Sequence, residues 1–155
     1  MKFETEEQKR LREKKAREER VRKRIKDGLI KKLSVTTVAY NVDDTSDEKP
    51  NISGITDWDE YWKHYTEEKF VNQKCASCCC ILDSSTRVGA HIRLKGEQDG
   101  TKDAWIALFC DSCNKSKDSQ RVNKGSWIVR TKMAEAHENV PTIKKNQLMK
   151  ELVKD

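Results

Sequence analysis

Four cysteines lie within six positions, from Cys75 to Cys80, and a second pair follows at Cys110 and Cys113. Thiols this close can form disulfides, bind a metal ion or fill small apolar spaces. The Cys75-x-x-Cys78 and Cys110-x-x-Cys113 pairs have the same spacing, with 31 residues between them. Two such pairs supply four thiolates to one tetrahedral ion, and Zn²⁺ prefers sulfur and needs no redox partner. We therefore expect a structural zinc ion held by Cys75, Cys78, Cys110 and Cys113.

The second ligand in the first pair is open to alternatives, because Cys78, Cys79 and Cys80 stand in a row. The matched two-residue spacing favours Cys78, although a longer knuckle through Cys79 or Cys80 is conceivable. We expect the two remaining cysteines to be small, partly buried hydrophobic residues. A redox dithiol is disfavoured because a thioredoxin-like βαβ pattern is expected around one.

The segment between the pairs carries a second pattern. Gly-Ala-His91-Ile follows the first pair, and an apolar stretch leads into Leu-Phe-Cys110-x-x-Cys-Asn114. Together these residues resemble the HNH endonuclease superfamily in its treble-clef, ββα-metal form with a four-cysteine zinc site. The resemblance covers roughly residues 73–120. It implies a ββα module, a nucleic-acid partner and hydrolysis of DNA phosphodiesters.

By this resemblance, His91 would be the general base that activates water, and Asn114 would bind a catalytic Mg²⁺ or Mn²⁺ ion. Two positions depart from the family pattern: Ala90 stands where active members carry Asp or His, and no Asn occurs near Trp105. Other carboxylates could substitute in three dimensions, namely Asp83, Asp99, Asp103 or Asp111. His91 could equally be a structural histidine. We therefore expect a degenerate nuclease site in a regulatory module that binds nucleic acid or protein, and the alternative is an active endonuclease.

The positive charge of the chain is concentrated at its N-terminus. Residues 1–32 contain 14 Lys or Arg and 7 Asp or Glu, a net charge of +7, whereas the remainder has a net charge of −1. Residues 4–27 contain no Pro or Gly and are rich in good helix formers, and Gly28 is a natural stop. A solvated helix is the first interpretation of this segment; an arm whose bases neutralise phosphates and a coiled-coil contact are the alternatives. The candidate nucleic-acid contacts are Arg17, Arg20, Lys23, Arg24, Lys115 and Lys117.

The other elements follow from local patterns. Residues 34–42 are β-branched and predict a strand, residues 43–54 predict an acidic linker, and residues 125–131 predict another strand. Residues 57–70 predict a helix with an aromatic face, which packs in the core or forms a docking surface for a protein partner. That face consists of Trp58, Tyr61, Trp62 and Tyr65.

The expected fold class is α+β, with four regions: a charged helical arm (1–33), a strand and acidic linker (34–56), the zinc module with its leading aromatic helix (57–131) and a C-terminal helical segment (132–155). The chain has no run of 18 apolar residues and no apolar stretch at its N-terminus, so we expect a cytoplasmic protein that contacts no membrane and keeps its thiols reduced. A module of this size with few aliphatic residues cannot fold by burial alone, so the metal should supply folding free energy.

Overall fold

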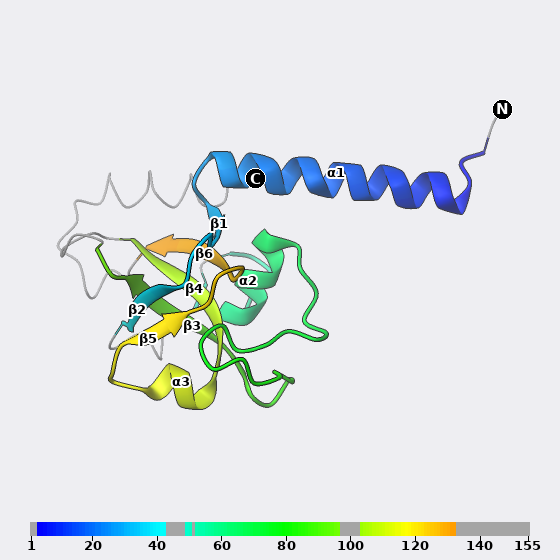
Figure 1. Cartoon of the computed structure of the whole chain (residues 1–155). Coiled ribbons are helices and arrows are strands. Elements are labelled where there is room, and N and C mark those ends of the chain that lie inside the picture. Colours follow the sequence, from blue (N-terminus) through cyan, green and yellow to red (C-terminus); the bar gives the residue numbers. More distant parts are fainter. Residues whose placement is uncertain (1–2, 43–48, 51, 97–102, 133–155) are drawn as a thin grey trace.

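The computed structural model describes residues 3–42, 49–50, 52–96 and 103–132 of the chain. It confirms a mixed α+β fold with a long N-terminal helix and a curled antiparallel sheet (Figure 1). The elements are, in chain order, α1 (Glu6–Lys26), β1 (Ile30–Lys32), β2 (Thr37–Asn41), α2 (Trp58–Thr66), β3 (Arg87–Leu94), β4 (Asp103–Cys110), α3 (Asp111–Lys115), β5 (Gln120–Val122) and β6 (Trp127–Lys132).

The sheet has six strands in the order β1-β6-β4-β3-β2-β5, and every neighbouring pair is antiparallel. The β3–β4 hairpin lies at its centre, with His91 opposite Ile106 and Ile92 opposite Trp105. α3 follows β4 directly, so the chain order in this part of the fold is β3-β4-α3. Strands β1 and β2 join the same sheet, which makes the region before the acidic linker part of the sheet.

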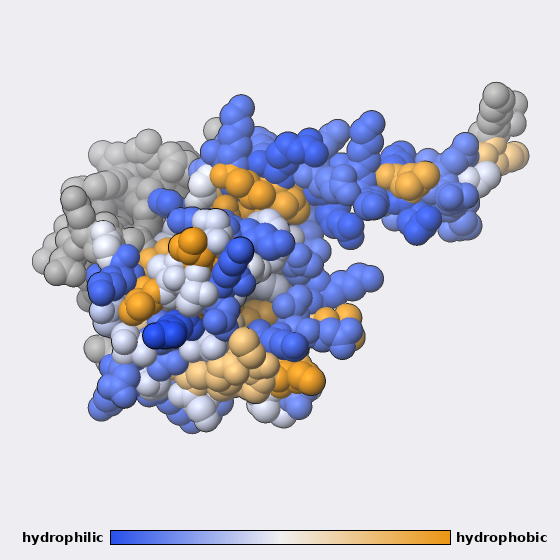
Figure 2. All heavy atoms as spheres, viewed as in Figure 1, coloured by the Kyte–Doolittle hydropathy of each residue, from blue (hydrophilic) through white to orange (hydrophobic). Residues whose placement is uncertain are grey.

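Helix α1 begins and ends where its sequence predicts. Thr5 and Gln8 form a reciprocal capping box, and the helix ends at Lys26 with Asp27 as its C-cap, after which Gly28 has a φ of +78°. The helix projects well beyond the sheet (Figure 1). Its surface is almost entirely hydrophilic in Figure 2, and Leu11 and Ile25 are exposed apolar exceptions. Among the described residues, its side-chain hydrogen bonds to the body come from Arg20 and Arg24 in its C-terminal half.

Helix α2 buries its aromatic face in the core. Tyr61, Trp62 and Tyr65 are almost fully buried, and the helix packs on β3, β4 and β6. Both polar tips are satisfied, because the Tyr61 hydroxyl donates to the carbonyl of Arg130 at 2.9 Å and Trp62 Nε1 donates to the carbonyl of Trp127 at 2.7 Å. The aromatic face therefore packs in the core, which is the first of the two uses predicted for it.

Some predicted elements lie outside the described residues. These are most of the acidic linker (43–48 and 51) and almost all of the C-terminal helical segment (133–155). Within the part that is described, no helix is both long and apolar enough to cross a membrane.

Candidate metal centre and histidine cavity

A tight turn brings the first group of cysteines together. The Cys75 N–H donates to the carbonyl of Cys80 at 2.8 Å, and the Cys79 N–H donates to the carbonyl of Cys75 at 3.0 Å. The Cys78 N–H points at the Cys75 sulfur, 3.5 Å away. An amide aimed at sulfur in this way stabilises a thiolate. The turn therefore places Cys75 and Cys78 where both sulfurs could bind one metal ion.

The second pair has the same local geometry. β4 ends at Cys110, α3 begins at the next residue, and the Cys113 N–H points at the Cys110 sulfur at 3.5 Å. A backbone hydrogen bond of 2.8 Å from Ala76 to the carbonyl of Leu108 holds the two cysteine segments side by side.

Four sulfurs converge between these segments. The Sγ atoms of Cys75, Cys78, Cys80 and Cys110 all lie within 4.8 Å of one another. Those of Cys78 and Cys110 are 3.7 Å apart, close to the separation of about 3.8 Å that Zn–S bonds of about 2.3 Å give in a tetrahedron. All six cysteines are free thiols. The donor set and its spacing therefore fit a metal ion such as zinc.

This group differs from the predicted one at one position. It contains Cys75, Cys78 and Cys110 as predicted, but Cys80 completes it, and Cys113 lies outside the group. Cys79 and Cys80 were expected to be partly buried hydrophobic residues, and this was wrong because both are exposed on the turn. The sequence left open whether Cys78, Cys79 or Cys80 is the second ligand of the first pair. The spacing alone did not single out Cys80.

The thiols strongly influence one another. Burial raises the pKa of the Cys113 thiol, and contacts with Cys110, Cys75 and Cys78 raise it further. Hydrogen bonding with Cys78 raises the pKa of Cys80 to about 12, with further contributions from burial and from Cys110. Crowded thiols resist ionisation because each thiolate repels the next. A bound divalent cation would reverse this effect, since it favours the thiolate form of every ligand.

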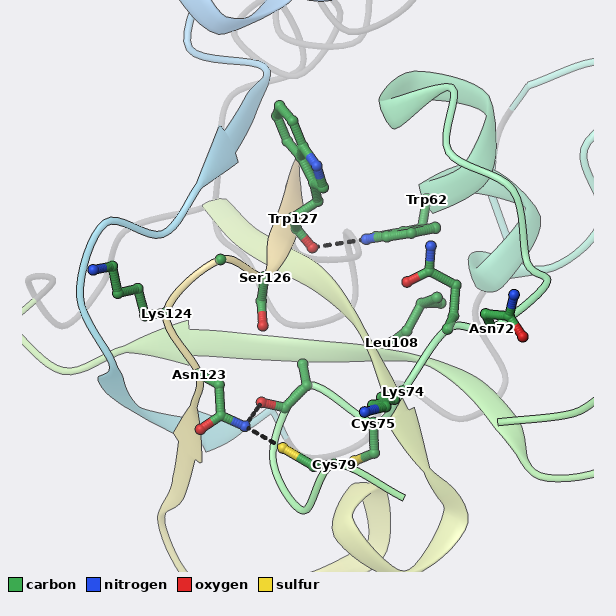
Figure 3. Close-up of a pocket in the computed structure, with 13 residues that line it drawn as sticks. Trp62, Asn72, Lys74, Cys75, Cys79, Leu108, Asn123, Lys124, Ser126 and Trp127 are labelled. Carbon is green, nitrogen blue, oxygen red and sulfur yellow. Dashed lines mark hydrogen bonds between the residues drawn. The ribbon is translucent and has the colours of Figure 1, made fainter. Parts of the chain in front are cut away.

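Cys79 lies outside the group of four sulfurs. Its backbone has a φ of +66°, and its Sγ atom accepts a hydrogen bond from Asn123 Nδ2 at 3.2 Å (Figure 3). The same amide donates to the carbonyls of Ala76 and Ser77 at 2.8 and 3.0 Å. The Asn123 side chain therefore donates hydrogen bonds to three atoms of the cysteine turn. The thiol lines a cavity of about 300 Å³ that also includes Trp62 and Trp127.

His91 and Asn114, the two residues singled out for catalysis, line one cavity of about 380 Å³. His91 is 5% exposed. Its ring packs edge-on against the Trp58 ring, with the two ring centroids 4.4 Å apart. Asp57 and Asp59, at the start of α2, line the same cavity. The structure therefore brings together His91, Asn114 and two carboxylates.

The two carboxylates were missed by sequence reasoning, which considered only acids near the cysteines. Asp59 accepts a hydrogen bond from Arg87 at 2.9 Å, and Asp57 lies 3.6 Å from Lys49. They reach the cavity because α2 packs directly on β3 at Gly89. A Cβ atom at Gly89 would lie 2.3 Å from the backbone carbon of Trp58.

The candidate nucleic-acid contacts fall into two groups. Arg20 and Arg24 are held by Glu67, and Arg24 is buried. Arg17, Lys23 and Lys117 are exposed, and Lys115 is an exposed base 2.9 Å from Asp111. Comparisons with protein-family models, with curated proteins and with solved structures find no match for this chain.

Proposed function

We propose that this chain is a zinc-stabilised, HNH-like module that binds nucleic acid through its projecting helix α1. The observation that carries the proposal is the charge of that helix. Residues 9–26 contain 11 Lys or Arg and 3 Glu, a net charge of +8. A 21-residue helix is about 31 Å long, so this charge is concentrated along one rod that projects from the sheet (Figure 2).

The bases of α1 divide into two roles. Arg20 and Arg24 fasten the helix to the body through Glu67. Lys14, Lys15 and Arg17 are exposed, as are Arg22 and Lys23. Each exposed base that neutralises a phosphate releases a condensed counterion, which is the main source of affinity in binding that is independent of sequence. The helix therefore suits contact with a phosphate backbone.

The zinc module serves as the platform for this arm. Thiolate ligands would hold the turn at Cys75 against the start of α3, and the metal would supply folding free energy to a small unit. Burial of His91 under Trp58 and the presence of Ala90 beside it favour binding without hydrolysis.

The salt dependence of DNA binding tests the role of α1. In one variant, Lys14, Lys15, Arg17, Arg22 and Lys23 are replaced by Gln; in a control of equal charge change, Lys31, Lys32, Lys69, Lys74 and Lys124 are replaced by Gln. If all five α1 bases contact phosphate, the slope of log K against log salt should become shallower by about 4.5 for the α1 variant. The body variant should change little. Equal slopes for the two variants would overturn the proposal.

A second candidate function is metal-dependent phosphodiester hydrolysis. The observation that favours it is the cavity shared by His91, Asn114, Asp57 and Asp59. Mg²⁺ prefers oxygen ligands. The HNH-like sequence motif supplies only Asn114 as a ligand for it, whereas the cavity adds the carboxylates of Asp57 and Asp59. His91 would activate the attacking water there.

Nicking of supercoiled DNA with Mg²⁺ or Mn²⁺ separates the two candidates. The hydrolytic function predicts nicking by the native chain that is lost in His91→Ala and Asn114→Ala. A His64→Ala variant, which changes an exposed histidine outside the cavity, should retain it. Zinc content and circular dichroism verify that each variant is folded. Absence of nicking by the native, zinc-loaded chain would exclude hydrolysis and leave the binding function intact.

A further inference from the structure

The metal centre has more thiols than a tetrahedral ion can bind. Cys75, Cys78, Cys80 and Cys110 form the tight group of four. Cys113 lies next to the same site, because its backbone N–H points at the Cys110 sulfur at 3.5 Å. Structural zinc takes four ligands. One of the five thiols must therefore be left over at any moment.

We propose that Cys80 and Cys113 exchange at one coordination position of the metal centre, while Cys75, Cys78 and Cys110 hold the other three. This inference rests on the proposed zinc centre, and it assigns to Cys80 a role as an alternative ligand.

The three ligands that stay bound come from both cysteine segments. Cys75 and Cys78 belong to one knuckle, and Cys110 belongs to the other. The 3.7 Å separation of the Cys78 and Cys110 sulfurs already matches two vertices of a tetrahedron around zinc. Cys80 and Cys113 approach this common set from opposite segments.

Exchange requires little movement of the backbone. The carbonyl of Cys80 is held by the Cys75 N–H at 2.8 Å, and the Cys113 backbone is held by its own N–H pointing at Cys110 Sγ. Both residues therefore stay beside the ion whichever thiol is bound. The two residues differ in exposure: Cys80 is exposed on the turn, whereas Cys113 is half-buried.

The exchange step balances without oxidation. The bond from the metal to Cys113 sulfur breaks as the bond to Cys80 sulfur forms. The proton lost by the Cys80 thiol passes through solvent to the departing Cys113 thiolate. The ion keeps four thiolates throughout, and the charge of the centre stays at −2. Because zinc can expand briefly to five ligands, the Cys80 sulfur can bind before the Cys113 sulfur leaves, and a spare thiol can recapture an opened coordination position.

Substitution with Co²⁺, which absorbs according to the number of thiolate ligands, tests the proposal on the full chain. The variants are Cys80→Ser, Cys113→Ser and the double variant. Cys79→Ser is the matched control, because its sulfur is bound by Asn123 and lies outside the group. Both single variants should keep the charge-transfer intensity of four thiolates, and the double variant should fall to about three quarters of it. Loss of intensity in either single variant would assign the fourth position to that cysteine alone and overturn the exchange.

A kinetic measurement gives a second readout. Transfer of zinc from the protein to a chromophoric chelator should be several-fold faster in Cys80→Ser than in the native chain, because no spare thiol recaptures an opened coordination position, and it should be unchanged in Cys79→Ser. Equal rates in all three proteins would contradict the exchange pathway. Zinc content of the native chain is measured first: a chain that binds no zinc would overturn the metal centre itself, which is distinct from a centre that binds zinc but has one fixed fourth ligand.

Discussion

Arg20 on α1 donates two hydrogen bonds to the carboxylate of Glu67, at 2.7 and 2.6 Å. Glu67 follows α2 directly and has a φ of +55°. The same carboxylate accepts a hydrogen bond from Arg24 at 3.0 Å, and the Arg24 guanidinium also donates to the carbonyl of Tyr65. One acidic residue thus ties the charged arm to the core helix.

Replacing Glu67 by Gln should lower the free energy of unfolding by about 2 kcal/mol, because charge-assisted hydrogen bonds are lost and Arg24 stays buried. Glu68→Gln removes the same charge one residue away, where no carboxylate hydrogen bond is observed among the described contacts, and should change stability little. Urea denaturation of both variants measures the difference. Equal stabilities would show that the pair does not fasten α1.

The Arg20–Glu67 pair also predicts a pH dependence. Hydrogen bonding with Arg20 lowers the pKa of Glu67 below its ordinary value of 4.5, and Arg24 contributes further. A carboxyl whose pKa is lowered by folding stabilises the protein above its unfolded pKa, and this contribution is lost as the pH falls through the folded pKa. The stability difference between the native chain and Glu67→Gln should therefore be constant near neutral pH and shrink below about pH 4.5. A difference that persists unchanged in acid would contradict the ion pair.

Replacing Gly89 by Ala should displace α2 from β3. The added Cβ would lie 2.3 and 2.4 Å from backbone atoms of Trp58 and Asp59, and backbone atoms cannot rotate away. Overpacking of this kind costs about 1–3 kcal/mol, and we expect the upper end of that range.

Gly54→Ala is the control for Gly89→Ala. Gly54 has a φ of +84° but no atom within 4 Å of an added Cβ, so it measures conformational strain alone, at about 1 kcal/mol. Thermal or urea denaturation compares the two variants. A smaller loss in Gly89→Ala than in Gly54→Ala would show that the close approach of α2 is dispensable.

Removal of the metal should unfold the cysteine region. Cys75 is 1% exposed and belongs to the hydrophobic core, so its turn is continuous with the packing of the sheet. A strong chelator should therefore lower the Tm and broaden the transition, and added Zn²⁺ should restore it. Circular dichroism with a parallel zinc assay follows both steps. An unchanged melting curve at zero zinc content would mean that the metal does not stabilise the fold.

Asn123→Ala should weaken zinc binding, because its side-chain amide holds the backbone between Cys75 and Cys78 in the turn that places both sulfurs. Asn123 binds the carbonyls of Ala76 and Ser77 and the sulfur of Cys79. Lys124→Ala changes an exposed neighbour and should leave affinity unchanged. Competition with a chelator of known affinity measures both variants. Equal affinities would limit Asn123 to a role in packing.

The sequence by itself determined the features that depend on neighbours along the chain. The ends of α1 follow from Thr5, Gln8 and Gly28, and the aromatic face of α2 follows from spacing at helical period. The two-residue cysteine spacing predicted two knuckles, and each shows its N–H pointing at sulfur. Such patterns are legible because caps, helical faces and tight turns are built from residues only a few positions apart.

Tertiary structure decided which distant residues meet. Cys80 joins the group of four sulfurs that could hold a metal ion because the turn bonds its carbonyl to Cys75, while Cys113 lies outside that group. Asp57 and Asp59 reach the cavity of His91 because α2 packs against Gly89. Arg24, which reads in the sequence as one base of a charged arm, becomes a buried anchor because Glu67 and Tyr65 lie beside it. These contacts join residues far apart in the chain, and only the packing of α1 and α2 against the sheet places them together.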